Sequence, residues 1–190
     1  MKLETVEERE DVLKLKIEGI NEVISNSLRR AMMTKVPTLA VKNLEIRKNE
    51  SALFDEVLAN RIGQVPLSVP DNVDKEDTVH VALKQEGPGE VLAEDLQMDN
   101  EEAEPVNPEA ILVTLKEDQE VDLEAEAVLD RGETHAKHQG GTIGYEKADE
   151  GEFVFRIEST SGYGNEELLE EAVEQIKMEL DEFEEAVEDL

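Results

Sequence analysis

The hydrophobic and polar positions predict a strand followed by a helix near each end of the chain, with short strands between them. Residues 12–18 place Leu13, Leu15 and Ile17 on one face and charged residues on the other. This period of two predicts a half-buried strand. Residues 153–157 alternate in the same way and predict a second such strand. The resulting order of elements suggests one region built from both chain ends, interrupted by an insertion.

A helix is predicted after the first strand. Asn21 can cap its first turn, and the helix should end before Val36, because a residue that precedes proline is driven out of the helical region. Its apolar stripe consists of Ile24, Leu28, Ala31 and Met32. Arg29 and Arg30 lie beside this stripe and point about 100° apart, so they cannot both serve one contact.

The middle of the chain indicates short strands. Extended segments are expected at 39–46, 78–84, 111–115 and 121–128. A helix is expected over 52–62, with Ser51 as its cap. Residues 86–108 are rich in Gly, Pro, Asp, Glu and Asn, which favours a long mobile loop with at most a short strand near Val91. We therefore interpret residues 49–150 as a mostly β domain.

A long helix is predicted from Asn165 to about Leu190. Its apolar residues repeat with alternating spacings of four and three, which is a heptad stripe: Leu169, Val173, Ile176, Leu180, Phe183, Val187 and Leu190. The stripe could cover the sheet of this protein, or its far end could reach a partner helix. Both can hold, because a helix of about 25 residues extends about 37 Å.

Composition makes the surface strongly acidic. The chain has 190 residues, 19 Lys and Arg against 49 Asp and Glu, and a net charge of −30. Such a charge disfavours direct binding of nucleic acid. A salt-rich cytoplasm would screen the self-repulsion, since the Debye length falls to about 3 Å at 1 M salt. A basic partner, or an ordinary solvated acidic surface, would also account for it.

One segment reverses this balance. Residues 29–48 contain six positive side chains but a single carboxylate, that of Glu45. The six are Arg29, Arg30, Lys35, Lys42, Arg47 and Lys48. Because the rest of the chain is acidic, this local reversal of charge requires an explanation.

Candidate chemistry is sparse. The chain has no cysteine, which excludes disulfides and thiolate metal sites. His135 and His138 form an HxxH pair, but two ligands are too few for a metal site and no third can be identified. No serine or threonine has an identifiable His or Asp partner, and Gly140, Gly141 and Gly144 do not fit a phosphate loop. We expect no catalytic residue, cofactor, metal, secretory signal or membrane helix.

Four segments together resemble a known family. They are NSLRRAMMTKVPTLAV, NESALFDEVLANRIGQVPL, HAKHQGG and FVFRIES. They are similar to the D subunits of archaeal DNA-directed RNA polymerases, which correspond to the eukaryotic third-largest subunit and to the bacterial alpha N-terminal domain. The similarity extends over nearly the whole chain.

This resemblance implies an α+β fold. A discontinuous dimerisation domain, a sheet plus two helices, would comprise residues 1–48 and 151–190, and an inserted mostly β domain would comprise 49–150. The dimerisation domain would bind subunit L through the helices at 21–35 and 165–190. The L-binding residues would then be Ile24, Leu28, Ala31, Met32, Val173, Ile176, Leu180, Phe183 and Val187.

The same resemblance implies a platform on which other subunits assemble. With subunits N and P, the D–L pair would carry the large catalytic subunits, and no polymerisation chemistry would reside in D. Arg30 matches the position that the family uses against the large beta-like subunit. Contacts with other subunits are also implied for Arg29, Arg61, His135 and Lys137.

The sequence departs from the family pattern in three places. Asn60 stands where the family often has histidine, and His138 where it often has an aromatic residue. Only residues 147–151 stand where many members carry a cysteine-rich insertion, so no iron–sulfur cluster is expected. The alternative function is a free acidic interaction protein, such as a nucleic-acid mimic or a chaperone-like homodimer. The basic segment argues against a mimic, which would not need it.

Overall fold

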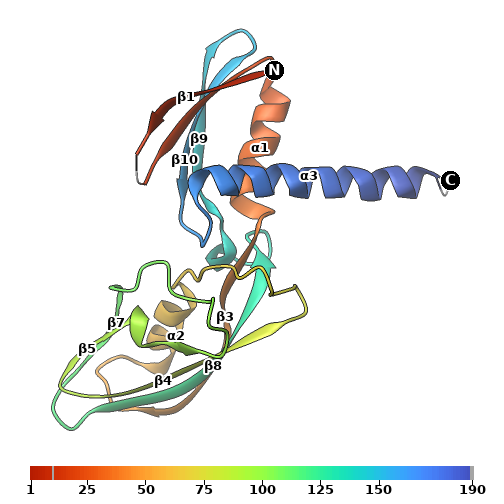
Figure 1. Ribbon diagram of the computed structural model, residues 1–190. Helices are drawn as coiled ribbons and strands as arrows, with labels where there is room; N and C mark the ends of the chain where they lie inside the picture. The colour runs from red at the N-terminus through yellow and green to blue at the C-terminus, as the bar shows by residue number, and fades with distance from the viewer. Residues whose placement is uncertain (10, 189–190) are drawn as a thin grey trace. The chain divides into compact units, whose positions relative to one another are not determined.

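The computed structural model describes residues 1–9 and 11–188, and the chain divides into two compact units (Figure 1). Met1–Pro37 and Arg131–Leu190 form what we call the terminal unit, and Thr38–Asp130 form the inserted unit. Each unit has its own hydrophobic core. The terminal unit therefore joins segments from both chain ends, as the order of the predicted elements suggested.

The terminal unit is built on a four-stranded antiparallel sheet. Its strands, in spatial order, are β1 (Lys2–Glu8), β2 (Leu13–Glu18), β10 (Glu152–Ser159) and β9 (Gly141–Asp149). The two strands predicted from alternation are the central pair, with Leu15 opposite Phe155. Apolar residues of both strands are buried on one face of this sheet.

Helices α1 (Glu22–Thr34) and α3 (Asn165–Glu188) pack with this sheet. The side chain of Asn21 caps α1 by accepting a hydrogen bond from the Ile24 backbone N–H at 3.0 Å, as predicted. Ala31 and Met32 at the other end of α1 are fully buried. A short 3-10 turn, η2 (Ala136–His138), precedes β9.

The inserted unit is mostly β. One sheet has the order β3 (Pro37–Asn49), β8 (Glu120–Arg131), β4 (Thr78–Glu86) and β6 (Gln97–Met98). A second sheet pairs β5 (Gly89–Leu92) with β7 (Ile111–Leu115). Helix α2 (Asp55–Gly63) and a 3-10 turn, η1 (Ala93–Asp95), complete the unit. Leu58 and Ile62 bury one side of α2 in the core of this unit.

Two sequence-based predictions in this unit are wrong. Helix α2 begins at Asp55 rather than at residue 52. Ser51 lies in a turn before it, where it donates its hydroxyl and backbone N–H to the Asn49 side-chain oxygen and accepts from the Leu53 backbone N–H. The short strand expected near Val91 is present as β5, but the rest of residues 86–108 is more ordered than the predicted mobile loop. They contain β5, η1 and β6, and their apolar residues Val91, Ala93 and Leu96 are buried in the core.

The fold is α+β with an inserted β-rich domain, as predicted. The units divide at 37/38 and 130/131, whereas the predicted domain limits were 48/49 and 150/151. The difference arises because β3 belongs to the sheet of the inserted unit, while β9 belongs to the sheet of the terminal unit. Strands β1 and β9 were not predicted from the sequence.

Candidate protein-interaction surface

An apolar groove of about 410 Å³ opens on the terminal unit. It lies among β1, β2, α1 and α3, and its lining is almost entirely hydrophobic: Met1, Leu3, Ile17, Ile20, Ile24, Ser27, Leu28, Leu169, Val173, Ile176 and Lys177. The predicted partner-binding residues Ile24 and Leu28 of α1 are thus brought beside Val173 and Ile176 of α3. The other two predicted residues of α1, Ala31 and Met32, are buried in the core instead.

The heptad stripe of α3 continues beyond this groove as an exposed surface. Leu180 is 61% exposed, Phe183 68% and Val187 49%. Figure 1 shows that α3 crosses α1 and then extends beyond it. The last predicted member of the stripe, Leu190, lies outside the described residues. The end of the stripe is therefore not used to cover the sheet of this protein.

A neighbouring row of α3 makes the packing contact instead. Leu168, Ala172 and Gln175 are the buried residues of the helix. The Gln175 side-chain oxygen accepts a hydrogen bond from the Arg131 guanidinium at 2.7 Å, which satisfies a polar group at the edge of the core. Because this row is spaced by four and three residues, it lies on one face of the helix. The heptad stripe lies beside that face and is left at the surface.

The exposed stripe is flanked almost only by carboxylates. Lys177 is the one basic residue of α3, and it pairs with Glu174 at 2.9 Å. Farther along, Glu179 pairs with Lys35, the residue that follows α1. Burial, followed by the charges of neighbouring glutamates, raises the pKa of Glu171 above its ordinary value. A surface that combines apolar side chains with dense negative charge is suited to a protein partner rather than to nucleic acid.

The paired arginines of α1 differ in their surroundings. Arg29 donates to the Asn26 side-chain oxygen at 3.1 Å and to the Met33 sulfur at 3.1 Å. Arg30 is exposed, and among the described residues its guanidinium has no hydrogen-bond or ion-pair partner. Arg30 is thus available to a neighbouring molecule.

The loop that carries His135 and Lys137 is fixed against the end of α1. Gly140 donates its backbone N–H to Met33 at 3.3 Å, and Glu133 donates to Thr34 at 3.2 Å. Exposed His135 caps η2, accepting from the Lys137 backbone N–H at 3.2 Å.

Two other candidate residues have separate positions. His138 is buried, so the two histidines do not share one exposed site. Arg61 belongs to the inserted unit, where it donates to the Leu112 carbonyl oxygen at 3.0 Å.

The basic residues of β3 have partners within the inserted unit. Arg47 pairs with Glu124 of β8 at 2.6 Å, Lys48 pairs with Glu120 at 2.7 Å, and Lys42 lies 4.0 Å from Asp130. Favourable cross-strand ion pairs therefore account for part of the local charge reversal. Among the positive residues between 29 and 48, the two arginines of α1 are the ones with no carboxylate partner in the described chain.

Strand β1 contributes to the groove although it was not predicted from the sequence. Met1 and Leu3 line it, and Leu3 is 53% exposed. The signal in the sequence is weak: Leu3 and Thr5 have the spacing of one face of a strand. In the structure nearly all side chains of β1 are exposed, so neither face contrasts with the other. A strand at the edge of a sheet with both faces near solvent gives no clear hydrophobic alternation.

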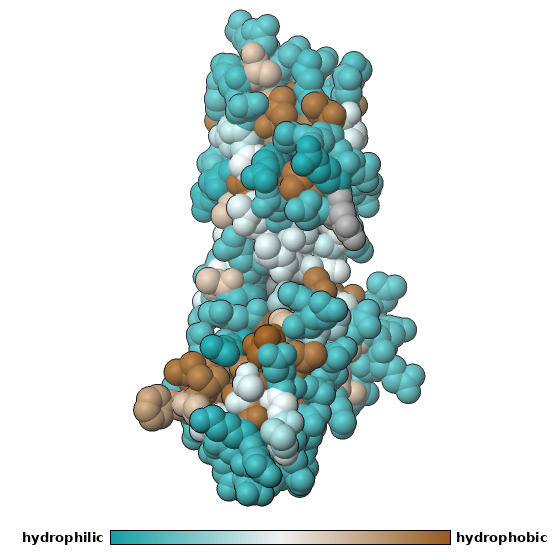
Figure 2. All heavy atoms as spheres, turned by 90° about the vertical axis from the view of Figure 1, so that its left-hand side faces the viewer, coloured by the Kyte–Doolittle hydropathy of each residue, from teal (hydrophilic) through white to brown (hydrophobic). Residues whose placement is uncertain are grey.

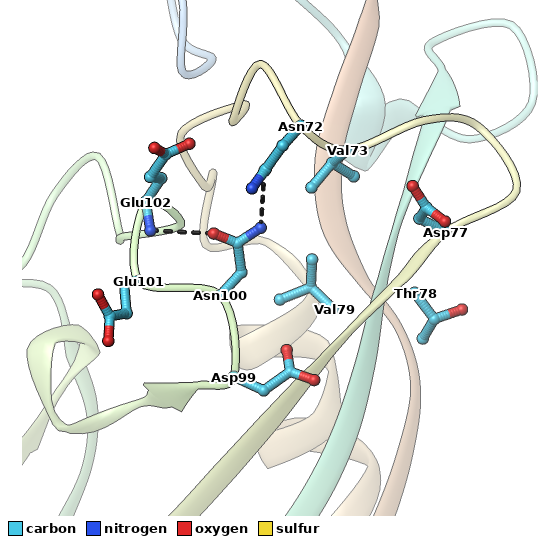
Figure 3. A pocket seen from close by; sticks show the side chains of 9 residues that line it. All are labelled: Asn72, Val73, Asp77, Thr78, Val79, Asp99, Asn100, Glu101 and Glu102. Carbon is cyan, nitrogen blue, oxygen red and sulfur yellow. Dashed lines mark hydrogen bonds between the residues drawn. The ribbon is translucent and has the colours of Figure 1, made fainter.

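A depression of about 590 Å³ in the inserted unit has a different character (Figure 3). Its amides satisfy each other, since Asn100 donates to Asn72 at 3.0 Å and accepts from the Glu102 backbone N–H at 3.0 Å. Asp99 accepts from the His80 backbone N–H at 2.9 Å. The polar side chains described here are thus engaged within the loops that form the depression.

Two further properties of the chain bear on the kind of site. Within residues 1–9 and 11–188, no group of three or more His, Cys, Asp or Glu side chains is placed to hold a metal ion. None of the helices described is both long and apolar enough to cross a bilayer. Figure 2 shows a mainly hydrophilic surface with separate hydrophobic groups on the face that it presents.

Comparisons with known proteins point to one family. A family model described as the RNA polymerase Rpb3/RpoA insert domain matches residues 50–151. The DNA-directed RNA polymerase subunit Rpo3 of Natronomonas pharaonis is 42% identical over 130 residues, which are 68% of this chain and 53% of that protein. Rpo3 of Pyrococcus furiosus is 39% identical over 152 residues, 76% of this chain and 58% of that protein.

A third relative is matched over most of its length. Rpo3 of Thermococcus kodakarensis is 34% identical over 189 residues, which are 96% of this chain and 71% of that protein. The chain spans a little over half the length of the first two relatives.

Proposed function

Because the chain belongs to the Rpo3 family of DNA-directed RNA polymerase subunits, we propose that it is a non-catalytic assembly component of such a polymerase. In this proposal it pairs with the small subunit L through α1 and α3. The pair, together with subunits N and P, then docks the large catalytic subunits for transcription. The protein works in the cytoplasm, and the active site lies in other subunits.

The main support for pairing with subunit L is the exposed heptad stripe of α3, which is continuous with the groove beside α1. Leu180, Phe183 and Val187 lie at the surface, and Val173 connects them to the groove. Exposed apolar side chains in a regular row are costly in water and mark interaction sites. A helix of the partner with its own apolar stripe would cover them by helix-to-helix packing.

Docking of the large subunits is assigned to Arg30 and to the loop before β9. Arg30 is exposed on α1, and the loop carrying His135 and Lys137 is held at the same end of that helix by the bonds to Met33 and Thr34. Arg29 and Arg61 complete the proposed set, although each is also bound within its own unit. Complementary charge at such a contact favours the correct partner.

Co-purification with subunit L tests the pairing. The chain is expressed with and without L in high salt, and each sample is analysed by gel filtration with light scattering. We expect a 1:1 complex with L. A stable, well-folded homodimer of the chain alone that ignores L would contradict the proposal and favour a free acidic interaction protein.

Leu180→Asp is the variant that separates pairing from folding. Because Leu180 is 61% exposed, the aspartate remains solvated in the free chain, and we expect an unchanged circular dichroism spectrum with loss of the complex. Phe54→Asp in the inserted unit is the matched control, since Phe54 is 79% exposed and lies outside the stripe. If Leu180→Asp binds L as the parent chain does, the stripe is not the interface.

A further inference from the structure

Strand β3 forms one edge of the larger sheet in the inserted unit. The sheet has the order β3, β8, β4 and β6, so one side of β3 faces β8 and the other side faces away from the sheet. An edge strand presents unpaired backbone N–H and C=O groups to other chains, and proteins usually protect such an edge.

Other edges in this chain carry recognisable protection. The pairing of β1 shifts its register between Thr5 and Glu7, which interrupts a regular edge. Strands β5 and β6 are only four and two residues long. Strand β3, in contrast, has 13 residues, and proline stands only at its first position, Pro37. The edge of β3 is therefore long and lacks these forms of protection.

The chain itself covers only the first part of this edge. Leu67 forms an antiparallel bridge with Leu39, donating its backbone N–H to the Leu39 carbonyl oxygen at 3.3 Å. The end of α2 comes near the next part, because a Cβ atom added at Gly63 would lie 3.6 Å from the Val41 carbonyl oxygen. From residue 42 to residue 48, β8 is the only segment of the described chain that is paired with β3.

Two hydrogen bonds identify the backbone groups that point outward. Leu39 uses its carbonyl oxygen on the outer side, towards Leu67, whereas the Glu50 N–H donates to the Glu120 carbonyl oxygen of β8 at 3.0 Å. The N–H and C=O of one residue point to the same side of a strand, and this side alternates along the chain. Positions 39 and 50 fit one unbroken alternation. The outward residues in the open part are Asn43, Glu45 and Arg47.

Apolar side chains at this edge are only half covered. Leu44 and Ile46 pack against the core of the inserted unit, but both remain half-buried. A strand added beside β3 would place its own side chains next to them, and cross-strand apolar pairs stabilise a sheet. The edge therefore favours a strand with apolar residues on the face that it shares with Leu44 and Ile46.

The charged side chains do not block this edge. Arg47 pairs with Glu124 at 2.6 Å and Lys48 with Glu120 at 2.7 Å, so both cations turn towards β8. Glu45 is exposed and has no ion-pair partner among the residues that the structure describes. Its carboxylate would attract a cation on a neighbouring strand.

We propose that residues 42–48 of β3 accept an extended segment of another polymerase subunit as an additional strand of this sheet. The segment has apolar residues beside Leu44 and Ile46 and a lysine or arginine opposite Glu45. This inference rests on the proposed function and specifies one contact of the inserted unit by its chemistry. In strand addition, backbone hydrogen bonds supply the affinity and alternate side chains supply the selectivity.

A second copy of this chain fits the edge poorly. Antiparallel pairing of β3 with itself about Glu45 would place two Glu45 carboxylates opposite each other, and like charges at opposed positions are destabilising. Each copy also carries a net charge of −30, which adds repulsion over the whole surface. A segment with a local positive charge is therefore the favoured occupant.

Hydrogen–deuterium exchange resolved to single amides tests the proposal. The polymerase is assembled from separately expressed subunits in high salt and is compared with the complex of this chain and subunit L. We expect the outward N–H groups of Asn43, Glu45 and Arg47 to exchange at least about tenfold more slowly after full assembly. Leu44 and Ile46, whose N–H groups face β8 in both samples, are internal controls and should change little.

Proline substitution provides the second measurement. Glu45→Pro removes an outward N–H but no bond to β8, and proline is accepted at such positions of edge strands. We expect an unchanged circular dichroism spectrum and retained binding to L, with loss of the protection that assembly gives to Asn43 and Arg47. Glu45→Ala is the matched control, because it removes the same carboxylate and keeps the N–H, so protection should persist.

The outcomes separate this inference from the proposed function. If the parent chain enters no complex with the other subunits, the proposed function fails and this inference fails with it. If the polymerase assembles while the outward amides exchange as fast as before, only the strand addition is wrong. Protection of the same amides in the chain alone, increasing with its concentration, would also overturn it, in favour of a second copy at this edge.

Discussion

Gly140 lies where the chain has no room for a side chain. A Cβ atom at this position would meet the Met32 carbonyl oxygen and would lie 2.8 Å from the Leu168 Cδ1 atom. The residue thus permits the loop before β9 to approach α1 and α3 closely. This contact also helps to hold the segment with His135 and Lys137 in place.

Substitution at Gly140 should therefore reduce stability. We expect Gly140→Ala to lower the free energy of unfolding by about 1–3 kcal/mol, the usual cost of overpacking. Gly144→Ala is the control, because nothing lies within 4 Å of a Cβ added there. Urea unfolding of both variants at one fixed salt concentration makes the comparison. Equal stability of the two variants would show that the loop moves away easily.

Tyr163 should make the folding stability of the terminal unit depend on pH in the alkaline range. Its hydroxyl donates to the Pro37 carbonyl oxygen at 3.1 Å, and burial raises the pKa of Tyr163 to about 12 from 10.0. The folded state therefore retains the phenolic proton more tightly than the unfolded state between these values. The contribution of Tyr163 to the free energy of unfolding is fully present below pH 10 and is lost as the pH rises from 10 toward 12.

The Tyr163 contribution can be measured by thermal unfolding between pH 8 and 12. We expect Tyr163→Phe to weaken the fall in melting temperature above pH 10, because phenylalanine has no proton to lose. Tyr145→Phe serves as the control for removal of a tyrosine hydroxyl from the same unit. An unchanged alkaline profile in Tyr163→Phe would mean that other groups govern it.

Individual residues explain which parts of the structure the sequence could predict. The strand β2 was predicted correctly from Leu13, Leu15 and Ile17, because these residues form its buried face while the other face is less buried. Asn21 gave a correct helix start because its side chain has a local backbone partner. Ser51 predicted a wrong helix start, because it lies in a local turn in which its hydroxyl oxygen accepts from the Leu53 backbone N–H, before α2 begins at Asp55. Local competition of this kind is invisible to a cap rule applied to one residue.

At the scale of elements, the hydrophobic pattern predicted a strand or helix face only where one side of the element is buried. Strands β1 and β9 lie at the two edges of their sheet, and most of their side chains are exposed, so they lack a clear alternation. The heptad stripe of α3 was recognised, yet its role depends on the adjacent row of Leu168, Ala172 and Gln175, which makes the contact with the core. Which of two neighbouring helix faces is buried depends on tertiary packing and cannot be obtained from spacing alone.

The exposed end of α3 should depend on ionic strength. Asp181, Glu184 and Glu188 are spaced three and four residues apart, which places like charges next to each other on the helix. Core packing does not compensate in this part, since its apolar residues are exposed. We expect the helical signal at 222 nm to increase as KCl is raised from 0.1 to 2 M.

Charge reversal at one position tests this explanation. Glu184→Lys places a cation three residues from Asp181 and four from Glu188, and we expect it to reduce the KCl concentration at which the helical signal is complete. Glu117→Lys makes the same change in net charge at an exposed residue in the turn between β7 and β8. If both variants shift the salt dependence equally, net charge rather than local repulsion in α3 is responsible.

At the scale of the whole molecule, a chain with two hydrophobic cores has a net charge of −30. Self-repulsion at this density opposes any compact state and is screened by salt. We expect the free energy of unfolding of the full chain to rise with KCl concentration. Sucrose at matched osmolality is the control. Equal stabilisation by both solutes would indicate solute exclusion from the surface, with no special role for charge screening.

The inserted unit is entered through β3 and left through β8, and these two strands are neighbours in one sheet. Lys42 and Asp130, each close to one of these crossings, lie 4.0 Å apart. A segment whose two ends emerge side by side can be exchanged, enlarged or removed by a single genetic event, with a short linker joining the remaining ends. The protein therefore has the construction of a cassette, in which the outer frame and its interior can evolve at different rates.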